Sequence, residues 1–261
     1  MTGNYRKARL WLIALLAAVL LSGTAITLAS PSTLTQFTGT TATGYDPLTP
    51  AEQARALQAL QGAGTVMQGL KVPDTAARTG AAAPAADVPA AAGAGEVLLI
   101  ERHQEDKQTY EQGRWPRRAD VYVYRYADDT LIHQVYNMDT NQVDQVDQVQ
   151  GVQLPLTAAE SQRALAIALA DAKVRPLLDA EFRLITQQDL VSGDQLILKA
   201  MTFHADAAPG RDLGEAAQCG IRRCAQLLLA AGDNVALQII PIVDLSSGRV
   251  VQALPFGPAP Q

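Results

Sequence analysis

The sequence has few of the residues from which active sites are usually built. Its 261 residues include three histidines and two cysteines. It also lacks a nucleophile elbow, a glycine-rich phosphate loop and a metalloprotease helix. The formal net charge is −5, and nucleic acid is not an expected partner for a chain that its N-terminal pattern, given below, marks for export from the cytoplasm. We therefore expect a protein that is not an enzyme and carries no cofactor.

The N-terminal 29 residues have the pattern of an export signal. Three basic residues precede an apolar run over residues 10–21, and small residues follow it. This order is typical of a signal peptide, cleaved here after Ala25 or Ala29. If it is not cleaved, residues 10–29 are long enough to anchor the chain in the inner membrane. Either way, we expect a periplasmic or extracellular protein that touches a membrane only through this segment.

One sequence pattern occurs twice. Pro47 to Leu57 and Pro155 to Leu165 both follow the pattern Pro-Leu-Thr-x-Ala-Glu-x-x-Arg-Ala-Leu. Further on, residues 117–139 align without gaps on residues 222–244, and both stretches start with two arginines. A looser alignment places His103 opposite His204. A period near 100 residues suits two copies of a small domain.

The pattern predicts an α+β fold of two tandem modules, each with one helix packed on an antiparallel sheet of about four strands. Module 1 covers residues 46–150 and module 2 covers 151–256. A Thr/Ser/Gly-rich linker (30–45) precedes them, an Ala/Pro/Gly insertion (76–95) interrupts the first, and residues 257–261 form a disordered tail.

The helices are expected to start at Thr49 and Thr157, where threonine caps a helix with a glutamate three residues later. Pro176 should stop the second helix. Alternating residues mark 120–127 as the clearest strand, while the triplet repeat of 141–149 suggests a strand with a turn or bulge. The other expected strands cover residues 96–105, 130–138, 182–186, 195–203, 221–230, 235–244 and 249–254.

Residues 45–255 resemble the small non-catalytic N-terminal domains of copper amine oxidases. The resemblance rests on the paired-arginine strand at Arg117, the hairpin to Asp139 and the Pro-Leu-Thr helix start at Pro155. It implies cystatin-like modules. That family's oxidase activity needs an Asn-Tyr-Asp/Glu motif and three copper-binding histidines in a large catalytic domain. The only Asn-Tyr pair in this sequence is Asn4-Tyr5, so the resemblance does not extend to the activity.

The histidines are weak candidates for metal binding. A copper or zinc site would need two or three of His103, His133 and His204 to converge. We expect polar strand positions instead, and no metal. The two cysteines, Cys219 and Cys224, are expected to form a structural disulfide, because a redox pair is more typically Cys-x-x-Cys.

The basic loop and the adjacent tyrosine stripe are candidates for an interaction surface with an anionic partner or a membrane surface, but a solvated loop and a stripe packed under the helix are the preferred interpretations. The candidate residues of this surface are Arg114, Trp115, Arg117, Arg118, Tyr122, Tyr124 and Tyr126.

The expected function is protein contact with another exported or envelope protein, as an accessory, assembly or scaffolding factor. Two alternatives remain open. One is a small-molecule or metal-ion carrier that uses the histidines or the tyrosine stripe. The other is a protease inhibitor, for which residues 147–151 approach the Gln-x-Val-x-Gly motif of cystatins without occupying its usual place in a central hairpin.

Overall fold

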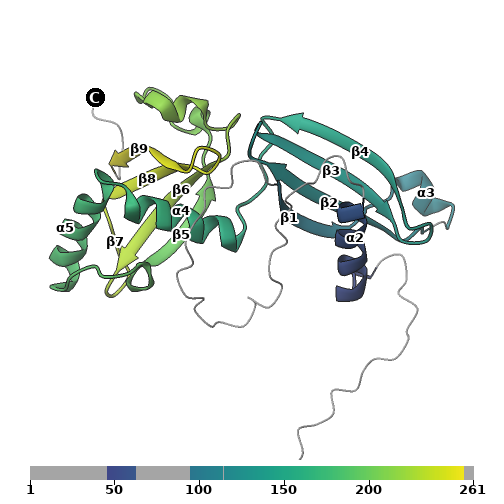
Figure 1. Ribbon diagram of the computed structural model, residues 1–261, viewed down its shortest axis with the longest axis horizontal. Helices are drawn as coiled ribbons and strands as arrows, with labels where there is room; N and C mark the ends of the chain where they lie inside the picture. The colour runs from purple at the N-terminus through teal and green to yellow at the C-terminus, as the bar shows by residue number, and fades with distance from the viewer. Residues whose placement is uncertain (1–45, 63–94, 114, 256–261) are drawn as a thin grey trace, which may run out of the picture. The chain divides into compact units, whose positions relative to one another are not determined.

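The computed structural model describes residues 46–62, 95–113 and 115–255. The predicted export signal, linker and tail, Arg114 and nearly all of the predicted insertion lie outside these residues. Within the described ranges, no helix is both long and apolar enough to cross a membrane. Two antiparallel sheets and a few helices make up a mixed α+β fold (Figure 1).

The first sheet, sheet A, is a four-stranded antiparallel meander. Its strands are β1 (Gly95–Arg102), β2 (Arg118–Arg125), β3 (Thr130–Asn137) and β4 (Gln142–Gln150), hydrogen-bonded in that order. Helix α2 (Pro50–Gly62) precedes the sheet, and a short helix, α3 (Lys107–Glu111), lies between β1 and β2. All four strands fall within or close to the predicted ranges, and α3 lies between the first two of these ranges.

Helix α2 starts where the sequence predicts. The Thr49 hydroxyl accepts a hydrogen bond from the Glu52 amide (3.3 Å), and the Thr49 amide donates to the Glu52 carboxylate (2.7 Å). These two bonds satisfy amide groups that a helix leaves unpaired at its first turn. Ala56 and Leu60 of α2 are buried with Val121 and Val123 of β2, so the helix covers the valine face of sheet A.

The tyrosine stripe lies on the opposite face of β2, so the predicted packing under its own helix is wrong. Because side chains alternate along a strand, Tyr122 and Tyr124 point away from α2 once the valines face it. Tyr124 and Tyr126 belong instead to the core that α4 and the second sheet form. Tyr122 stacks on His133, with ring centroids 4.6 Å apart.

Strand β4 contains the predicted irregularity. Its pairing with β3 shifts register between Val135 and Tyr136, so that Asp144 has no paired residue on β3, as in a bulge. The strand lies at an edge of sheet A, and almost all of its residues are exposed.

The second sheet, sheet B, follows two helices, α4 (Ala158–Ala170) and α5 (Val174–Thr186). Its main path is β5 (Ile197–Thr202), β6 (Cys224–Ala231), β8 (Ile239–Asp244) and β9 (Arg249–Pro255), and the short β7 (Val235–Ala236) also pairs with β6. Helix α4 begins with the predicted capping box of Thr157 and Glu160. The predicted strand at 235–244 is split in two, since residues 237 and 238 belong to neither β7 nor β8.

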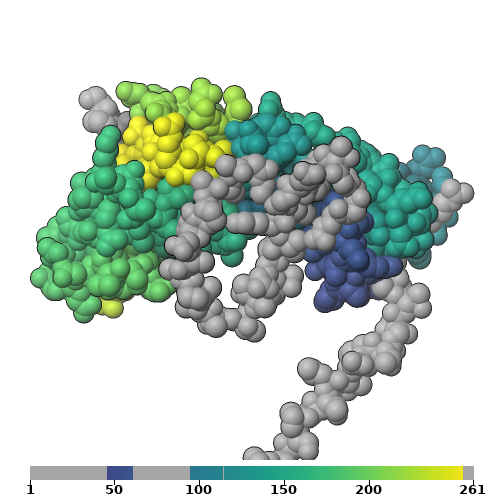
Figure 2. All heavy atoms as spheres, viewed as in Figure 1, coloured from purple at the N-terminus to yellow at the C-terminus, as the bar shows by residue number. Residues whose placement is uncertain are grey.

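Two predictions for α5 are wrong. Residues 182–186 form its last part rather than a strand, and Pro176 lies inside its first turn rather than beyond a helix end. Proline fits there because the first amides of a helix have no intrahelical partner. Asp171 caps the turn by accepting bonds from the amides of Lys173 and Val174, both 2.9 Å. Figure 2 shows α5 at the surface, in green.

Sheet B is covered differently on its two faces. On one face, Leu165 of α4 and Phe182 of α5 pack with Leu227 and Leu229 of β6. Part of the other face is covered by the segment after β5, in which Phe203, Leu213 and Ala216 pack against β8. That segment holds the short helices η3 (Ala205–Ala207) and η4 (Gly214–Gln218). The side chains of β5 on this second face remain exposed.

Candidate functional site

A buried ion pair ties the start of α2 to sheet A. The Arg117 guanidinium donates to both carboxylate oxygens of Glu52, at 2.8 and 2.9 Å. It also donates to the carbonyl oxygens of Asp46 (2.5 Å) and Pro47 (2.9 Å), just before the helix. The same Glu52 completes the Thr49 cap. One arginine therefore fixes the chain entering the helix and the first turn of that helix.

The same arrangement occurs at the start of α4. Arg223 donates to both oxygens of Glu160, at 2.5 and 2.8 Å, and to the carbonyl oxygens of Leu154 (2.9 Å) and Pro155 (3.2 Å). Both charged side chains are fully buried, with 0% exposure. A bidentate pair of this kind is strong and directional, and it tolerates burial because the donors and acceptors are satisfied.

The strand register shows which arginines correspond. The Met138 amide donates to the Arg117 carbonyl (2.8 Å), and the Leu245 amide donates to the Arg223 carbonyl (2.9 Å). Arg117 therefore matches Arg223, and the alignment that placed it on Arg222 is wrong by one residue. Neighbouring residues of a strand point to opposite faces of the sheet. Only one of two adjacent arginines can therefore point toward the helix start, and the strand register shows which one it is.

A cluster of polar side chains joins sheet A to the start of α4. It consists of Glu96 of β1, Tyr126, Glu160, Arg163 and Arg223. The Tyr126 hydroxyl lies 2.8 Å from Glu160 Oε1 and 3.0 Å from Glu96 Oε2. Arg163 donates to Glu96 (2.9 Å) and to the Tyr126 oxygen (2.7 Å). Two carboxylates and two guanidiniums balance in charge, so the cluster connects the sheets without leaving a net buried charge.

The cluster perturbs the acidity of its members. Burial alone would raise the pKa of Glu160, but the hydrogen bonds and charge of Arg223 hold it below its ordinary value. Burial raises the pKa of the Tyr126 phenol, and the nearby Glu160 and Glu96 carboxylates raise it further. At the start of α2, the hydrogen bond from Arg117 lowers the pKa of Glu52 to about 2. At neutral pH these shifts keep the Glu52 and Glu160 carboxyls ionised and the Tyr126 phenol protonated.

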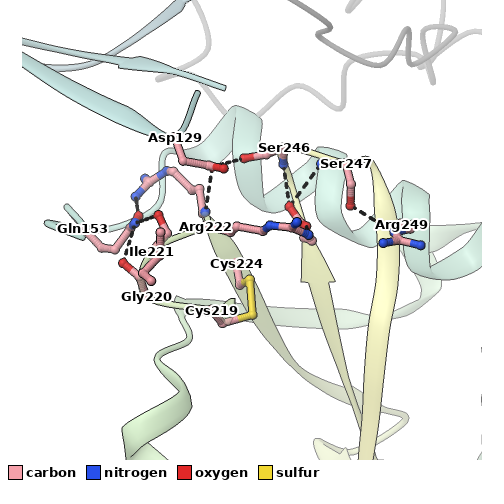
Figure 3. The surroundings of a disulfide bond; sticks show 12 residues. Asp129, Gln153, Cys219, Gly220, Ile221, Arg222, Cys224, Ser246, Ser247 and Arg249 are labelled. Carbon is pink, nitrogen blue, oxygen red and sulfur yellow. Dashed lines mark hydrogen bonds and ion pairs between the residues drawn. A yellow bond between two sulfur atoms is a disulfide. The ribbon is translucent and has the colours of Figure 1, made fainter. Parts of the chain in front are cut away.

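The turn between β2 and β3 also reaches sheet B. Asp129, which has a positive φ of 52°, accepts hydrogen bonds from Tyr124 (3.0 Å), the Arg223 amide (3.3 Å) and the Ser246 hydroxyl. Figure 3 shows Asp129 between Ser246 and the start of β6. The Arg223 guanidinium also lies over the Tyr124 ring, 5.2 Å from its centroid. The contacts between the sheets therefore extend beyond the polar cluster.

Two of the three histidines meet on one carboxylate. His103 Nδ1 lies 2.8 Å and His133 Nε2 lies 2.7 Å from the same oxygen of Asp120. His204 is not part of this group. The register matches His103 to Phe203, because their amides donate to the equivalent carbonyls of Arg118 and Cys224, so the predicted equivalence of His103 and His204 is wrong. In the described part of the chain, no three His, Cys, Asp or Glu side chains are arranged to hold a metal ion.

The predicted disulfide between Cys219 and Cys224 is confirmed (Figure 3). It closes a short loop directly before β6 and lies next to Arg223. Gln153 donates to the Gly220 carbonyl in this loop, at 3.1 Å. The bond therefore fixes the approach of the chain to the buried arginine.

The predicted interaction surface is largely used in internal contacts. Arg117, Tyr124 and Tyr126 are buried, and Arg118 forms an ion pair with Glu105. Trp115 is exposed and lines an open hollow of about 540 Å³ together with Thr109, Pro116, Arg118 and Asn137. The structure therefore does not bring the six described candidates together as one surface, and Arg114 lies outside the described residues.

Sequence reasoning missed the acidic members of the buried pairs as site residues. The repeated pattern contains the signal, because it places a glutamate and an arginine three positions apart in each copy: Glu52 with Arg55, and Glu160 with Arg163. It does not indicate which distant arginine completes each pair.

No protein-family model matches the chain, and no curated protein matches it. Among solved structures, it is similar to a copper-containing benzylamine oxidase from Hansenula polymorpha, with 14% identity and a TM-score of 0.48 over 83% of this chain. An Aspergillus nidulans amine oxidase matches 80% of the chain, with 13% identity and a TM-score of 0.37. The chain spans 30% and 28% of these two proteins. Both of these proteins are amine oxidases.

Proposed function

We propose that this chain is an exported, non-catalytic protein that works through contact with another exported or envelope protein, as an accessory, assembly or scaffolding factor. The observation that supports this most directly is the polar cluster between the sheets. Its charged side chains are buried and bonded to one another, which suits a rigid body with a fixed surface. Catalytic groups, by contrast, must be able to reach a substrate.

The shared contacts support a duplication of one cystatin-like module. In both copies a capped helix start, its first-turn glutamate and a strand arginine form the same set of bonds, from Thr49, Glu52 and Arg117 in one and Thr157, Glu160 and Arg223 in the other. With the two bonds to the carbonyls before each helix, there are six equivalent bonds in each copy, and their independent origin is less economical than duplication. Two joined modules present a longer surface to a partner than either does alone.

Affinity purification tests this function. The full-length tagged chain is purified from envelope fractions, and co-purifying proteins are identified by mass spectrometry, with an unrelated exported protein carrying the same tag as the control. We expect one reproducible partner in stoichiometric amount. Recovery of the chain alone, at several detergent and salt conditions, would contradict the proposal.

A metal or small-molecule carrier is the second candidate. The observation that favours it is the convergence of His103 and His133 on Asp120, on the same face as Tyr122. Metal analysis of the same purified sample separates the two functions. A stoichiometric metal that is lost in His133→Ala, with no protein partner, would establish the carrier instead.

A further inference from the structure

The exposed part of sheet B has a covered counterpart in sheet A. In sheet A, Glu96 of β1 pairs with Tyr124 of β2. In sheet B, Ile197 of β5 pairs with Ala230 of β6. Ala230 lies five residues after Ala225, as Tyr124 lies five after Ala119, and these two alanines are equivalent by register. Ile197 and Ala230 therefore occupy the positions of Glu96 and Tyr124.

The position in sheet A is covered by the start of a helix. Glu96 is bonded to Arg163 of α4, and Tyr124 lies beneath Arg223, so both are buried. The equivalent position in sheet B lies at an open edge. Ile197 is 44% exposed and Met201 is 45% exposed. Among the described residues, helices η3 and η4 cover the β8 side of this face and do not bury these two side chains.

The chemistry of the open surface differs from that of its counterpart. The open surface, which we call the β5 face, consists of the exposed Ile197, Lys199 and Met201 on β5 and the half-buried Ala230, Leu228 and Gln226 that pair with them on β6. Cross-strand pairing places Ile197 beside Ala230 and Lys199 beside Leu228 on one side of the sheet. Gln226 lies beside Met201, and Leu228 also packs against the cluster that includes Phe203. The exposed side chains of β5 on this face are thus two apolar residues, Ile197 and Met201, on either side of a single cation. Such a surface at the edge of a sheet is typical of a protein contact site.

We infer that the β5 face binds an amphipathic helix of a partner protein, whose apolar side covers Ile197 and Met201 and which carries a carboxylate opposite Lys199. This rests on the proposed function and identifies the surface it uses. A helix is the occupant because a helix start covers the equivalent position in sheet A. Charge complementarity supplies the acidic group.

A second copy of this chain fits the β5 face poorly. Two such faces packed symmetrically would bring Lys199 against its own counterpart, a like-charge contact that costs binding energy. The start of α4 is already buried against sheet A. The start of α2 of a second copy is also a poor fit. Its Arg55 corresponds to Arg163 of α4, which binds Glu96 in sheet A. In sheet B the position of Glu96 is occupied by Ile197, so Arg55 would find no carboxylate there.

Photo-crosslinking of the full-length chain in cells tests the inference. A photo-reactive phenylalanine derivative replaces Met201, and in a control chain it replaces Leu184, which is 76% exposed on α5. We expect adducts from position 201 that map to a helix of another protein, and none with that protein from position 184. Adducts with residues 63–94 or 256–261 of the same chain, or with a second copy, would overturn the inference.

A charge exchange then tests the predicted carboxylate. Lys199→Glu should weaken binding of the purified crosslinked partner at least about tenfold, which is about 1.4 kcal/mol, while Leu184→Ser leaves it unchanged. Replacing the partner's acidic residue by lysine should restore binding to Lys199→Glu. Unchanged binding of Lys199→Glu, or a co-purified partner without crosslinks from position 201, would refute the β5 face and leave the proposed function intact. Absence of any partner in the affinity purification would refute both.

Discussion

Removal of Arg223 should be among the most damaging single changes in this protein. Arg223→Ala leaves the Glu160 carboxylate buried with only Tyr126 and the Thr157 amide as donors. It also leaves the Leu154 and Pro155 carbonyls without this partner. Breaking one side of a fully buried ion pair typically costs about 3–5 kcal/mol of unfolding free energy. That is a large part of the stability of an ordinary domain.

The neighbouring arginine is a matched control. Arg222 forms an ion pair with Asp244 at 3.3 Å, but its side chain is 41% exposed. The Asp244 carboxylate is buried, but without Arg222 it still accepts hydrogen bonds from the amides of Ser246 and Ser247. Arg222→Ala should therefore cost clearly less unfolding free energy than Arg223→Ala. The two substitutions remove the same type of side chain from consecutive positions. Because neighbouring side chains point to opposite faces, the two arginines differ in burial and in partners.

Urea unfolding at pH 7 with the disulfide intact measures both changes. A double variant, Glu160→Leu with Arg223→Met, removes both charges and should recover most of the stability lost in Arg223→Ala. If Arg223→Ala cost no more than Arg222→Ala, the buried pair would not hold α4 to the sheet, and the register argument would fail. If the double variant were as unstable as Arg223→Ala, packing rather than an unpaired carboxylate would explain the loss.

Three further changes test other contacts. The pKa of Glu52 is lowered from 4.5 to about 2 in the folded protein. The ionised Glu52 therefore contributes about 3 kcal/mol to the free energy of unfolding above pH 4.5, and this contribution is lost as the pH falls toward 2. Urea midpoints measured across that range should decline less in Glu52→Gln than in the wild type. Cys219 and Cys224 lie five positions apart, and reducing the disulfide of so short a loop should cost about 2 kcal/mol of unfolding free energy. Urea unfolding with and without dithiothreitol measures this cost. An unchanged midpoint would mean that other contacts hold the loop without the disulfide. Tyr126→Phe removes a hydroxyl bonded to Glu160 and Arg163 and should lower the free energy of unfolding by about 1–3 kcal/mol. Amide hydrogen exchange should become faster first at the start of α4. A uniform increase over the whole chain would argue against a local role of this hydroxyl.

Local sequence patterns predicted much of the secondary structure. The capping threonines Thr49 and Thr157 predicted both helix starts, because a cap depends only on residues within one turn. Alternation predicted β2, and the triplet repeat predicted the bulge in the pairing of β4. The spacing of Cys219 and Cys224 predicted their bond. Pro176 was misleading, because proline stops a helix from its interior and is accepted in the first turn.

The tertiary structure decided which face of each element is used, and which distant residues meet. Alternation in β2 placed the valines and tyrosines on opposite faces, but only the packing of α2 showed that it covers the valines. Two adjacent arginines look alike in sequence, and only strand register selected Arg223 for the buried pair. Long-range electrostatic partners depend on the path of the whole chain, so the sequence alone identified the repeated helix starts, and the fold determined how they are held.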